Sequence, residues 1–238
     1  MKKVIITGAT SYLCAELAQR LVGMGVEVHA IQRAQSNLKR LNTLETLINI
    51  YLYDGNTDAL RELFESINPD VVFHLAGKYI REEHSGDFDN LIAANIAFGS
   101  HLLEALRDSG VKCVVNTGSY FQFGDAGSAP INFYAACKNA FAEILHYYTS
   151  QNDFSATSLI IFDSYGPGDW RPKLFPAALE AIRNNSVLAI PTKNVTLYPV
   201  YVSDVVDCFI EAAMHLLNGT DGISGESFAV RGDKAVSI

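Results

Sequence analysis

Two residues whose spacing suits proton-transfer chemistry, Tyr134 and Lys138, stand four positions apart in the stretch Tyr-Ala-Ala-Cys-Lys. On a helix this spacing places both side chains on one face. A free phenol has a pKa of about 10 and is a poor base at neutral pH, but a neighbouring ammonium group stabilises its phenolate. Such a tyrosine can exchange a proton with a hydroxyl or a carbonyl while a hydride moves to or from a nicotinamide. Because this spacing is common on helices, the surrounding elements must decide whether it marks a site.

A phosphate-binding loop is predicted where the first apolar run, residues 4–7, gives way to a helix. The loop reads Gly-Ala-Thr-Ser-Tyr-Leu-Cys over residues 8–14. The free N–H groups at a helix start, aided by the helix dipole, form a cradle for a pyrophosphate. An ordinary strand-to-helix turn is the alternative interpretation. The residues expected to hold the cofactor here are Gly8, Thr10, Ser11, Tyr12 and Leu13.

The second predicted strand ends at Arg33, where an NAD enzyme usually presents Asp or Glu to the ribose diol. A carboxylate would repel a 2′-phosphate, whereas Arg33 can pair with one through two hydrogen bonds. Ser36, Asn37 and Arg40 follow within reach. The predicted cofactor is therefore NADP(H), with NAD(H) as the alternative. The competing interpretation is that Arg33, Lys39 and Arg40 form a solvated helix start.

Short β-branched runs alternate with longer helical patterns along most of the chain. Repeated strand–helix units imply right-handed crossovers and a mostly parallel sheet covered by helices on both faces. The predicted fold class is therefore α/β, a Rossmann-type doubly wound parallel sheet, with ligands beyond the carboxyl ends of the strands. Strands are predicted at 4–7, 26–31, 71–75, 111–115 and 158–162, and helices at 15–22, 60–67, 91–106, 134–149, 174–182 and 205–217.

Charge and composition exclude several classes of protein. The 238 residues carry 18 Lys and Arg against 26 Asp and Glu, and this net charge of −8 disfavours general binding to nucleic acid or anionic lipid. A hydrophobic content of 49% excludes global disorder. No apolar run approaches the roughly 20 residues of a membrane span, and the run after Met1 is too short for a signal peptide. The four scattered cysteines predict free thiols in a reducing cytoplasm and no metal site.

In their order along the chain, several segments resemble the extended short-chain dehydrogenase/reductase family of NAD(P)-dependent nucleotide-sugar epimerases, dehydratases and reductases. The branch that looks most similar contains 4-ketoreductases of the CDP-abequose synthase type. The resemblance covers residues 3–237. It rests on the loop at Gly8, where Ser11 and Cys14 replace two family glycines, on His74-Leu75-Ala76-Gly77, on the Tyr134 and Lys138 pair, on Phe162-Asp163-Ser164-Tyr165-Gly166-Pro167-Gly168-Asp169, and on Pro199-Val200-Tyr201-Val202-Ser203-Asp204-Val205.

The resemblance implies roles for residues beside Tyr134. Ser119, which follows a predicted strand, would hydrogen-bond the reacting sugar oxygen, with Thr117 as the fallback for this role. Lys138 would also reach the ribose hydroxyls of the nicotinamide. Asn95 matches a helix asparagine near the family's active site and is expected to be either catalytic or a packing amide.

The same resemblance assigns the rest of the cofactor site and limits the chemistry. Asp54 is expected to contact adenine. Family dehydratases carry an Asp-Glu pair directly after the catalytic hydroxyl residue, and Tyr120 and Phe121 stand there instead, which argues against elimination of water. The residues expected beneath the cofactor ribose are Leu75, Ala76 and Gly77.

Substitutions on the substrate side depart from the family pattern. Asp163 replaces an asparagine whose amide donates hydrogen bonds, which an ionised carboxylate cannot do. Leu197 stands where many epimerases use an arginine to clamp the nucleotide diphosphate. Arg171 and Lys173 could supply this missing charge, or could lie in a solvated loop. The predicted substrate-binding residues are Thr117, Asp163, Arg171 and Lys173.

These observations predict a dinucleotide-binding Rossmann domain at residues 1–164 and a mainly substrate-binding region at 165–238, from which the chain returns to the core. This small region is either naturally short or incomplete. The expected activity is NADP(H)-dependent reduction of a nucleotide-linked 4-keto-6-deoxy sugar, with hydride from the nicotinamide and a proton from Tyr134. The alternatives are an NAD-dependent nucleotide-sugar 4-epimerase and a non-catalytic NAD(P)-binding regulatory protein. A cytoplasmic homodimer is expected.

Overall fold

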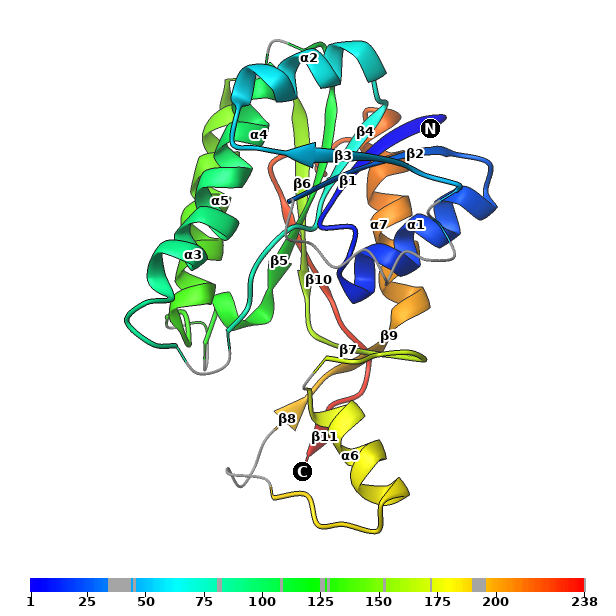
Figure 1. Ribbon diagram of the computed structural model, residues 1–238, viewed down its shortest axis with the longest axis vertical. Helices are drawn as coiled ribbons and strands as arrows, with labels where there is room; N and C mark the ends of the chain where they lie inside the picture. Colours follow the sequence, from blue (N-terminus) through cyan, green and yellow to red (C-terminus); the bar gives the residue numbers. More distant parts are fainter. Residues whose placement is uncertain are drawn as a thin grey trace.

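A seven-stranded sheet forms the centre of the computed structural model (Figure 1), which describes residues 1–33, 44, 46–80, 83–107, 109–124, 127, 129–151, 153–171, 173–189 and 196–237. The strand order is β10-β6-β5-β4-β1-β2-β3, and every neighbouring pair runs parallel. The winding direction changes between β1 and β4, which is where this kind of sheet binds its ligands. The strands are β1 (Lys3–Thr7), β2 (Glu27–Arg33), β3 (Asn49–Tyr53), β4 (Val71–His74), β5 (Cys113–Ser119), β6 (Ser155–Ile161) and β10 (Ser227–Val230).

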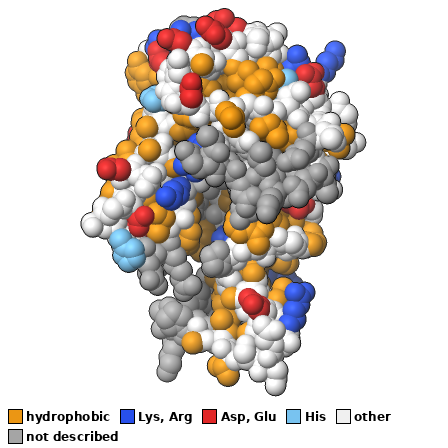
Figure 2. Space-filling view, in the orientation of Figure 1, with side chains coloured by type: hydrophobic (Ala, Val, Ile, Leu, Met, Phe, Trp, Pro, Cys, Tyr) orange, Lys and Arg blue, Asp and Glu red, His pale blue; other side chains and the backbone are white. Residues whose placement is uncertain are grey.

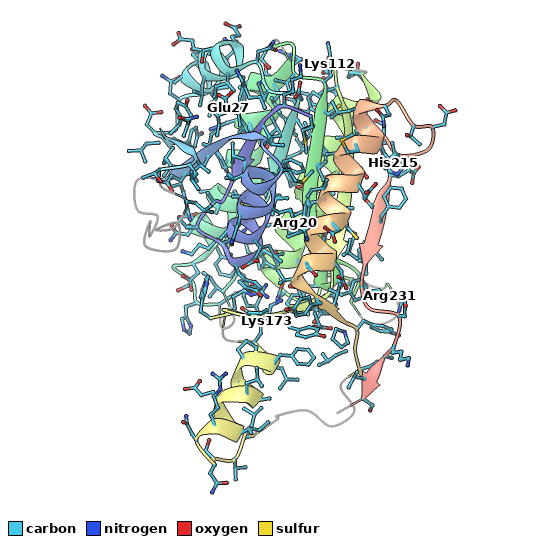
Figure 3. All side chains as sticks on the ribbon, turned by 90° about the vertical axis from the view of Figure 1, so that its right-hand side faces the viewer. Arg20, Glu27, Lys112, Lys173, His215 and Arg231 are labelled. Carbon is cyan, nitrogen blue, oxygen red and sulfur yellow. The ribbon has the colours of Figure 1, made fainter. Side chains whose placement is uncertain are left out.

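Helices cover both faces of this sheet, as Figure 1 shows. One face carries α1 (Tyr12–Gly23) and α7 (Val202–Leu217), which are joined by an ion pair of 3.1 Å between Arg20 and Asp207 on the side seen in Figure 3. The other face carries α2 (Thr57–Ile67), α4 (Phe98–Arg107) and α5 (Phe133–Ser150). In the described residues no helix is both long and apolar enough to cross a membrane. The predicted α/β, doubly wound sheet is confirmed.

The hydrophobic core consists of two layers, one on each face of the sheet, and β1 contributes side chains to both. Val4 and Ile6 point into the layer under α1 and α7, where Phe209 also packs. Ile5 points into the opposite layer with Phe141 of α5. A strand without polar alternation is the expected pattern for a parallel sheet that is covered on both sides.

A small lobe extends from the carboxyl ends of the strands (Figure 1). It contains α6 (Leu174–Arg183) and the antiparallel pair β8 (Thr196–Leu197) and β11 (Val236–Ser237). The parallel pair β7 (Asp163–Tyr165) and β9 (Pro199–Tyr201) lies between this lobe and the main body. None of the residues of α6 is buried. At the opposite end of the molecule, charged side chains gather on the surface over α2 (Figure 2).

Two elements differ from the sequence prediction. The single helix predicted at 91–106 is divided into α3 (Phe88–Ile92), the π-helical segment η2 (Ala93–Ala97) and α4. A π-helical turn is wider than an α-helical turn, so it changes the direction of the side chains that follow. Such segments are frequent at functional sites. Strand β10 was not predicted, because Ser-Phe-Ala-Val is short and carries little β-branched character. It pairs with β6 and, with α7, returns residues after 200 to the main body.

Candidate active site

A cavity of about 680 Å³ lies beyond the carboxyl ends of β4 and β5, between the start of α1 and the small lobe. Lys173 stands where the main body meets α6 (Figure 3). Most of the predicted site residues line this cavity, which brings together segments from all parts of the chain. They are Ser11, Tyr12, Leu13, Leu75, Gly77, Thr117, Ser119, Tyr134, Lys138, Asp163, Arg171 and Lys173.

The turn between β1 and α1 is held close to the end of β4. Gly8 has φ +78°, and a Cβ atom there would lie 2.8 Å from the Ala76 Cα, so only glycine fits. The Ser11 N–H donates to the Gly8 carbonyl at 2.9 Å. Cys14, at a family glycine position, is fully buried, and its thiol donates to the Thr7 carbonyl at 3.3 Å. The loss of that glycine is therefore accommodated.

The end of β4 is fixed by a buried hydrogen-bond chain. The Thr7 hydroxyl accepts the Ala76 N–H at 3.2 Å and lies 2.9 Å from His74 Nδ1. Burial, with a smaller effect of the Lys138 charge, lowers the pKa of His74 to about 3, so this imidazole is neutral. These bonds hold residues 74–77 at the floor of the cavity.

Ser119, Tyr134 and Lys138 converge on the cavity from β5 and α5. The Ser119 hydroxyl is hydrogen-bonded to the Tyr134 phenol. The Ser119 N–H donates to the Gln122 side chain at 2.7 Å in a capping box that fixes the end of β5. Lys138 is buried, and its Nζ donates to the Thr117 carbonyl at 2.9 Å. The sequence prediction that these groups share one site is matched by this geometry.

The start of α5 is positioned by two side chains. The Asn132 side chain accepts the Ala135 N–H at 2.9 Å as a helix cap. The Glu83 carboxylate accepts the N–H groups of Phe133 and Tyr134 at 3.4 and 3.2 Å. A carboxylate is favourable at a helix N-terminus because of the helix dipole. Sequence reasoning missed Glu83, since it lies 51 residues before Tyr134 with no spacing signal that connects them.

The ionisation of the site follows from its burial. Burial raises the pKa of Tyr134 to about 12, and the hydrogen bond from Ser119 offsets only part of this effect. Burial also lowers the pKa of Lys138 to about 8. The direction for Tyr134 differs from the sequence expectation that Lys138 lowers its pKa, because burial dominates and the ammonium instead bonds the Thr117 carbonyl. Tyr134 is therefore a protonated phenol at neutral pH.

Asn95 lies in η2 and is buried. Its Oδ1 accepts the Lys78 N–H at 3.1 Å, and its Nδ2 donates to the Lys78 and Leu91 carbonyls at 2.9 and 3.0 Å. A Cβ atom on Gly77 would lie 2.9 Å from Asn95 Oδ1. These contacts are those of a packing amide beside Gly77, and the catalytic role of Asn95 stays a prediction.

The residues present fit a dinucleotide in the part of the cavity nearest the sheet. Thr117 lines the cavity, and its buried Oγ1 has no hydrogen-bond partner among the described residues, so it offers a polar group to a ligand. Gly8 and Gly77 leave no space for a side chain, which keeps the backbone open to close approach. The three N–H groups that begin α1 have no intrahelical acceptor, as at any helix start.

Five predicted cofactor residues lie outside the walls of the cavity, and Gly8, in the turn described above, is one of them. Arg33 is exposed at the end of β2, and the predicted partners Ser36, Asn37 and Arg40 lie outside the described residues. Asp54 is exposed after β3, and its carboxylate accepts the Asn56 N–H at 2.9 Å in the turn before α2. Thr10, in the turn after β1, and Ala76, in the segment after β4, are not among the lining residues.

On the substrate side, two predicted binding residues are engaged by the protein. The Asp163 carboxylate accepts the Tyr120 hydroxyl and the Tyr198 N–H, each at 3.1 Å. Arg171 forms an ion pair with Asp169 at 2.7 Å. Sequence reasoning missed the contact between Tyr120 and Asp163. Tyr120 stands where family dehydratases carry an acidic residue, and Asp163 replaces a family asparagine. These two departures together could have indicated that the side chains meet.

Comparison with known proteins agrees with this architecture. The chain is 27% identical over 222 residues to a CDP-abequose synthase of Yersinia pseudotuberculosis, with 92% of this chain and 75% of that protein covered. It is 27% identical over 229 residues to a UDP-glucose 4-epimerase of Mycolicibacterium smegmatis, with 88% and 72% covered.

A solved structure shares the fold. A UDP-glucuronic acid 4-epimerase of Bacillus cereus, determined with NAD and a fluorinated UDP-glucuronic acid, superposes with a TM-score of 0.85 at 22% identity, over 99% of this chain and 79% of that one. The model of the NAD dependent epimerase/dehydratase family matches residues 4–225 of this chain. The relatives of this chain named above are enzymes. This chain therefore belongs to the NAD dependent epimerase/dehydratase family.

Proposed function

We propose that this enzyme reduces a nucleotide-linked 4-keto-6-deoxy sugar with NADP(H), and that Tyr134 is the proton donor. The observation that carries this proposal is the convergence of Ser119, Tyr134 and Lys138 on one cavity, where burial raises the pKa of the Tyr134 phenol. Reduction of a carbonyl needs a proton at its oxygen, and a phenol whose pKa is about 12 remains available as an acid at neutral pH. The similarity to CDP-abequose synthases supports this substrate class.

The chain's own residues would divide the work as follows. The turn before α1 and the first residues of that helix, together Thr10 to Leu13, would bind a pyrophosphate through backbone N–H groups. Residues 75–77 would lie beneath the adjacent ribose. When bound, the dinucleotide supplies the hydride. Ser119 would orient the carbonyl oxygen toward the Tyr134 hydroxyl, and Lys138 would hold Thr117 and the ribose hydroxyls in place.

The preference for a 2′-phosphorylated cofactor rests on Arg33. Its exposed guanidinium at the end of β2 supports pairing with a phosphate, and no carboxylate stands at that position to repel one. Asp54 would lie near the adenine. NAD(H) remains the alternative, since structurally similar proteins were solved with NAD.

The substrate half of the cavity supports a ketone reduction rather than a dehydration. Tyr120 and Phe121 stand where a dehydratase needs carboxylates, and the nearby Asp163 already accepts two hydrogen bonds. Lys173 lines the same part of the cavity and would bind the nucleotide diphosphate. The remaining wall includes the apolar side chains of Leu174, Phe175, Leu188 and Leu197, which suits a sugar that carries a methyl group in place of its 6-hydroxymethyl group.

The proposal is tested by the stoichiometry of cofactor use. NADPH absorbance at 340 nm should fall by one equivalent for each 4-keto nucleotide sugar added, and mass spectrometry should detect a product two mass units heavier. Heat-denatured enzyme and Tyr134→Phe are the controls. If the sugar is unchanged although NADPH binds, the proposed substrate class is wrong.

A 4-epimerase is the second candidate, favoured by the similarity to the UDP-glucose 4-epimerase of M. smegmatis. This reaction needs Tyr134 first as a base and then as an acid, whereas its raised pKa favours the acid. An epimerase would interconvert two UDP-sugars with no net change in NADPH. Detection of both epimers by NMR, without added cofactor, would support this candidate against the reductase.

We place the enzyme in the cytoplasm as a homodimer. All four cysteines, including the exposed Cys208, are unpaired, which suits a reducing compartment. The side chains of Phe88 and Ile92 on α3 are exposed, as is Ile131 before α5, and these helices are the expected dimer surface. Light scattering should give twice the monomer mass, and Ile92→Glu should reduce it to the monomer mass.

A further inference from the structure

The Arg171 side chain is held by hydrogen bonds to residues of its own chain, which indicates a role other than substrate binding. Its Nε and Nη2 atoms each donate to one carboxylate oxygen of Asp169 at 2.7 Å. Nη2 also donates to the Ser164 carbonyl at 2.9 Å. The side chains of Arg171 and Asp169 are only 17% and 3% exposed. The charge of this guanidinium is therefore neutralised inside the protein, and its donors are directed at protein acceptors.

The same guanidinium covers the ring of Tyr12. The Arg171 Cζ lies 4.7 Å from the centre of that ring, within cation–π range. On its other end, the Tyr12 hydroxyl donates to the Pro167 carbonyl at 3.1 Å. A Cβ atom on Gly166 would lie 2.6 Å from the Tyr12 hydroxyl oxygen, so the loop packs directly on it. Residues 164–171 thus enclose Tyr12.

Tyr12 is the first residue of α1, and Ser11 before it is the N-cap without a side-chain capping bond. The N–H groups of this first turn are those that would bind the cofactor pyrophosphate. Ser11 also replaces a family glycine, so the loop has lost one of the residues that define its shape in relatives. A contact that fixes Tyr12 from outside therefore fixes the orientation of these N–H groups.

We infer that Arg171 is a positioning residue for the dinucleotide-binding start of α1, acting through Tyr12, and not a ligand of the substrate diphosphate. Asp169 holds the guanidinium in place, and the Gly-Pro-Gly turn holds the Tyr12 hydroxyl. This inference rests on the proposed function in one respect, namely that the start of α1 binds a dinucleotide. It separates the roles of two neighbouring residues: Arg171 supports the dinucleotide site, whereas Lys173, two residues later, binds the diphosphate of the substrate.

The test compares the dissociation constant of NADPH, measured by calorimetry without any sugar, with the KM for the nucleotide sugar. Arg171→Met should weaken NADPH binding about tenfold, because a buried cation–π contact and its hydrogen bonds are lost. Lys173→Met should leave NADPH binding unchanged and raise the KM for the sugar. Arg183→Met, a matched change at an exposed arginine of α6, should alter neither quantity.

Tyr12 variants sharpen this test. Tyr12→Leu should weaken NADPH binding as much as Arg171→Met does, and the double variant should be no weaker than either single variant, because both act through one contact. Additive losses would contradict the coupling. Arg171→Lys and Asp169→Asn provide milder changes if Arg171→Met does not fold, and both should weaken NADPH binding.

The outcomes separate this inference from the proposed function. If the wild-type protein binds neither NADPH nor NADH, the proposed function fails. If the wild-type protein binds NADPH and Arg171→Met binds it equally, while the KM for the sugar rises, Arg171 is a substrate ligand and the inference is overturned.

Discussion

The two halves of the cavity are built in different ways. The half that we propose binds the dinucleotide is formed by the backbone at the ends of β1 and β4, where Gly8 packs against Ala76 and Thr7 is fully buried. The substrate half is formed by side chains that extend from α6 and the segments beside it, and no residue of α6 is buried. Close packing leaves the first half little freedom to change, whereas side chains in the second half can be exchanged at small cost in stability.

This difference suggests how the substrate preference of such a protein can change while its proposed catalytic groups stay in place. Ser119 and Tyr134 are fixed by the sheet and by the capped start of α5, so the chemistry stays with the main body. The lobe can vary its lining without moving these groups. Variants in the first half should therefore alter catalysis, cofactor binding or stability. Variants in the second half should alter only the KM for the sugar, with the exception of Arg171, which contacts Tyr12 of the first half.

The largest effect is expected from Tyr134→Phe. Loss of the only phenol hydrogen-bonded to Ser119 in the described part of the chain should lower kcat by about 10²–10⁴-fold, because the proton donor is removed. NADPH binding, measured by fluorescence, should be unchanged. Retention of more than half of the wild-type kcat would contradict the role of Tyr134.

A large effect on binding and stability is expected from Gly8→Ala. The new Cβ would meet the backbone of Ala76, and the positive φ adds strain. The free energy of unfolding should therefore fall by about 2–3 kcal/mol, and NADPH binding should weaken. Gly25→Ala is the matched control, since Gly25 has φ +77° but its added Cβ would meet no atom of the described residues within 4 Å. Equal losses in both variants would show that backbone strain alone, and not the contact with β4, matters at Gly8.

A gain in stability is expected from Lys138→Met. The fold lowers the pKa of Lys138, so its charged form is disfavoured in the native state, and removal of the charge should stabilise the protein at pH 7 by about 1–3 kcal/mol. The wild type carries this cost fully below pH 8 and loses it as Lys138 deprotonates, so the gain should shrink toward pH 10. Chemical denaturation at several pH values measures it, and a variant less stable than wild type at pH 7 would contradict the sign.

A smaller effect is expected from Lys173→Met, which should raise the KM for the nucleotide sugar about tenfold and leave kcat unchanged. Burial, assisted by the charge of Arg171, lowers the pKa of Lys173 to about 8. Its ammonium is therefore lost as the pH rises past 8, and the wild-type KM should rise between pH 8 and 9 while that of Lys173→Met stays constant. Parallel pH profiles of KM in the two proteins would argue against Lys173 as a phosphate ligand.

The smallest effect is expected from Arg33→Ser. Loss of an exposed guanidinium should weaken NADPH binding by roughly fivefold and leave NADH binding unchanged, because only NADPH carries the 2′-phosphate. Competition titrations with both cofactors measure the ratio. An equal loss for NADPH and NADH would place Arg33 outside the cofactor site.

Much of this architecture was predictable, because periodicity and glycine positions are local properties of the sequence. The runs at β1, β4 and β5, the loop at Gly8 and the helix carrying Tyr134 and Lys138 were predicted, and the structure brings them to one cavity. The pairing of Tyr120 with Asp163 and of Arg171 with Tyr12 was not predictable from spacing. Those contacts join positions that are distant in sequence, and they depend on side-chain packing between the lobe and the main body.

The ionisation of the site was also beyond sequence reasoning. Tyr134 and Lys138 line one cavity, but the direction of the shift in the Tyr134 pKa depends on how deeply the phenol is buried. Burial depends on every element around the cavity. Asn95 illustrates the same limit, since only its three backbone bonds distinguish a positioning amide from a catalytic one.

The most direct test of Tyr134 as an acid is the rate of NADPH oxidation in a single turnover, at saturating 4-keto nucleotide sugar, from pH 7 to pH 10. Since its pKa lies near 12, the phenol stays protonated throughout this range. We predict a rate that does not increase with pH. A rate that increases about tenfold for each pH unit would require a phenolate as the active form, and would contradict Tyr134 as the proton donor.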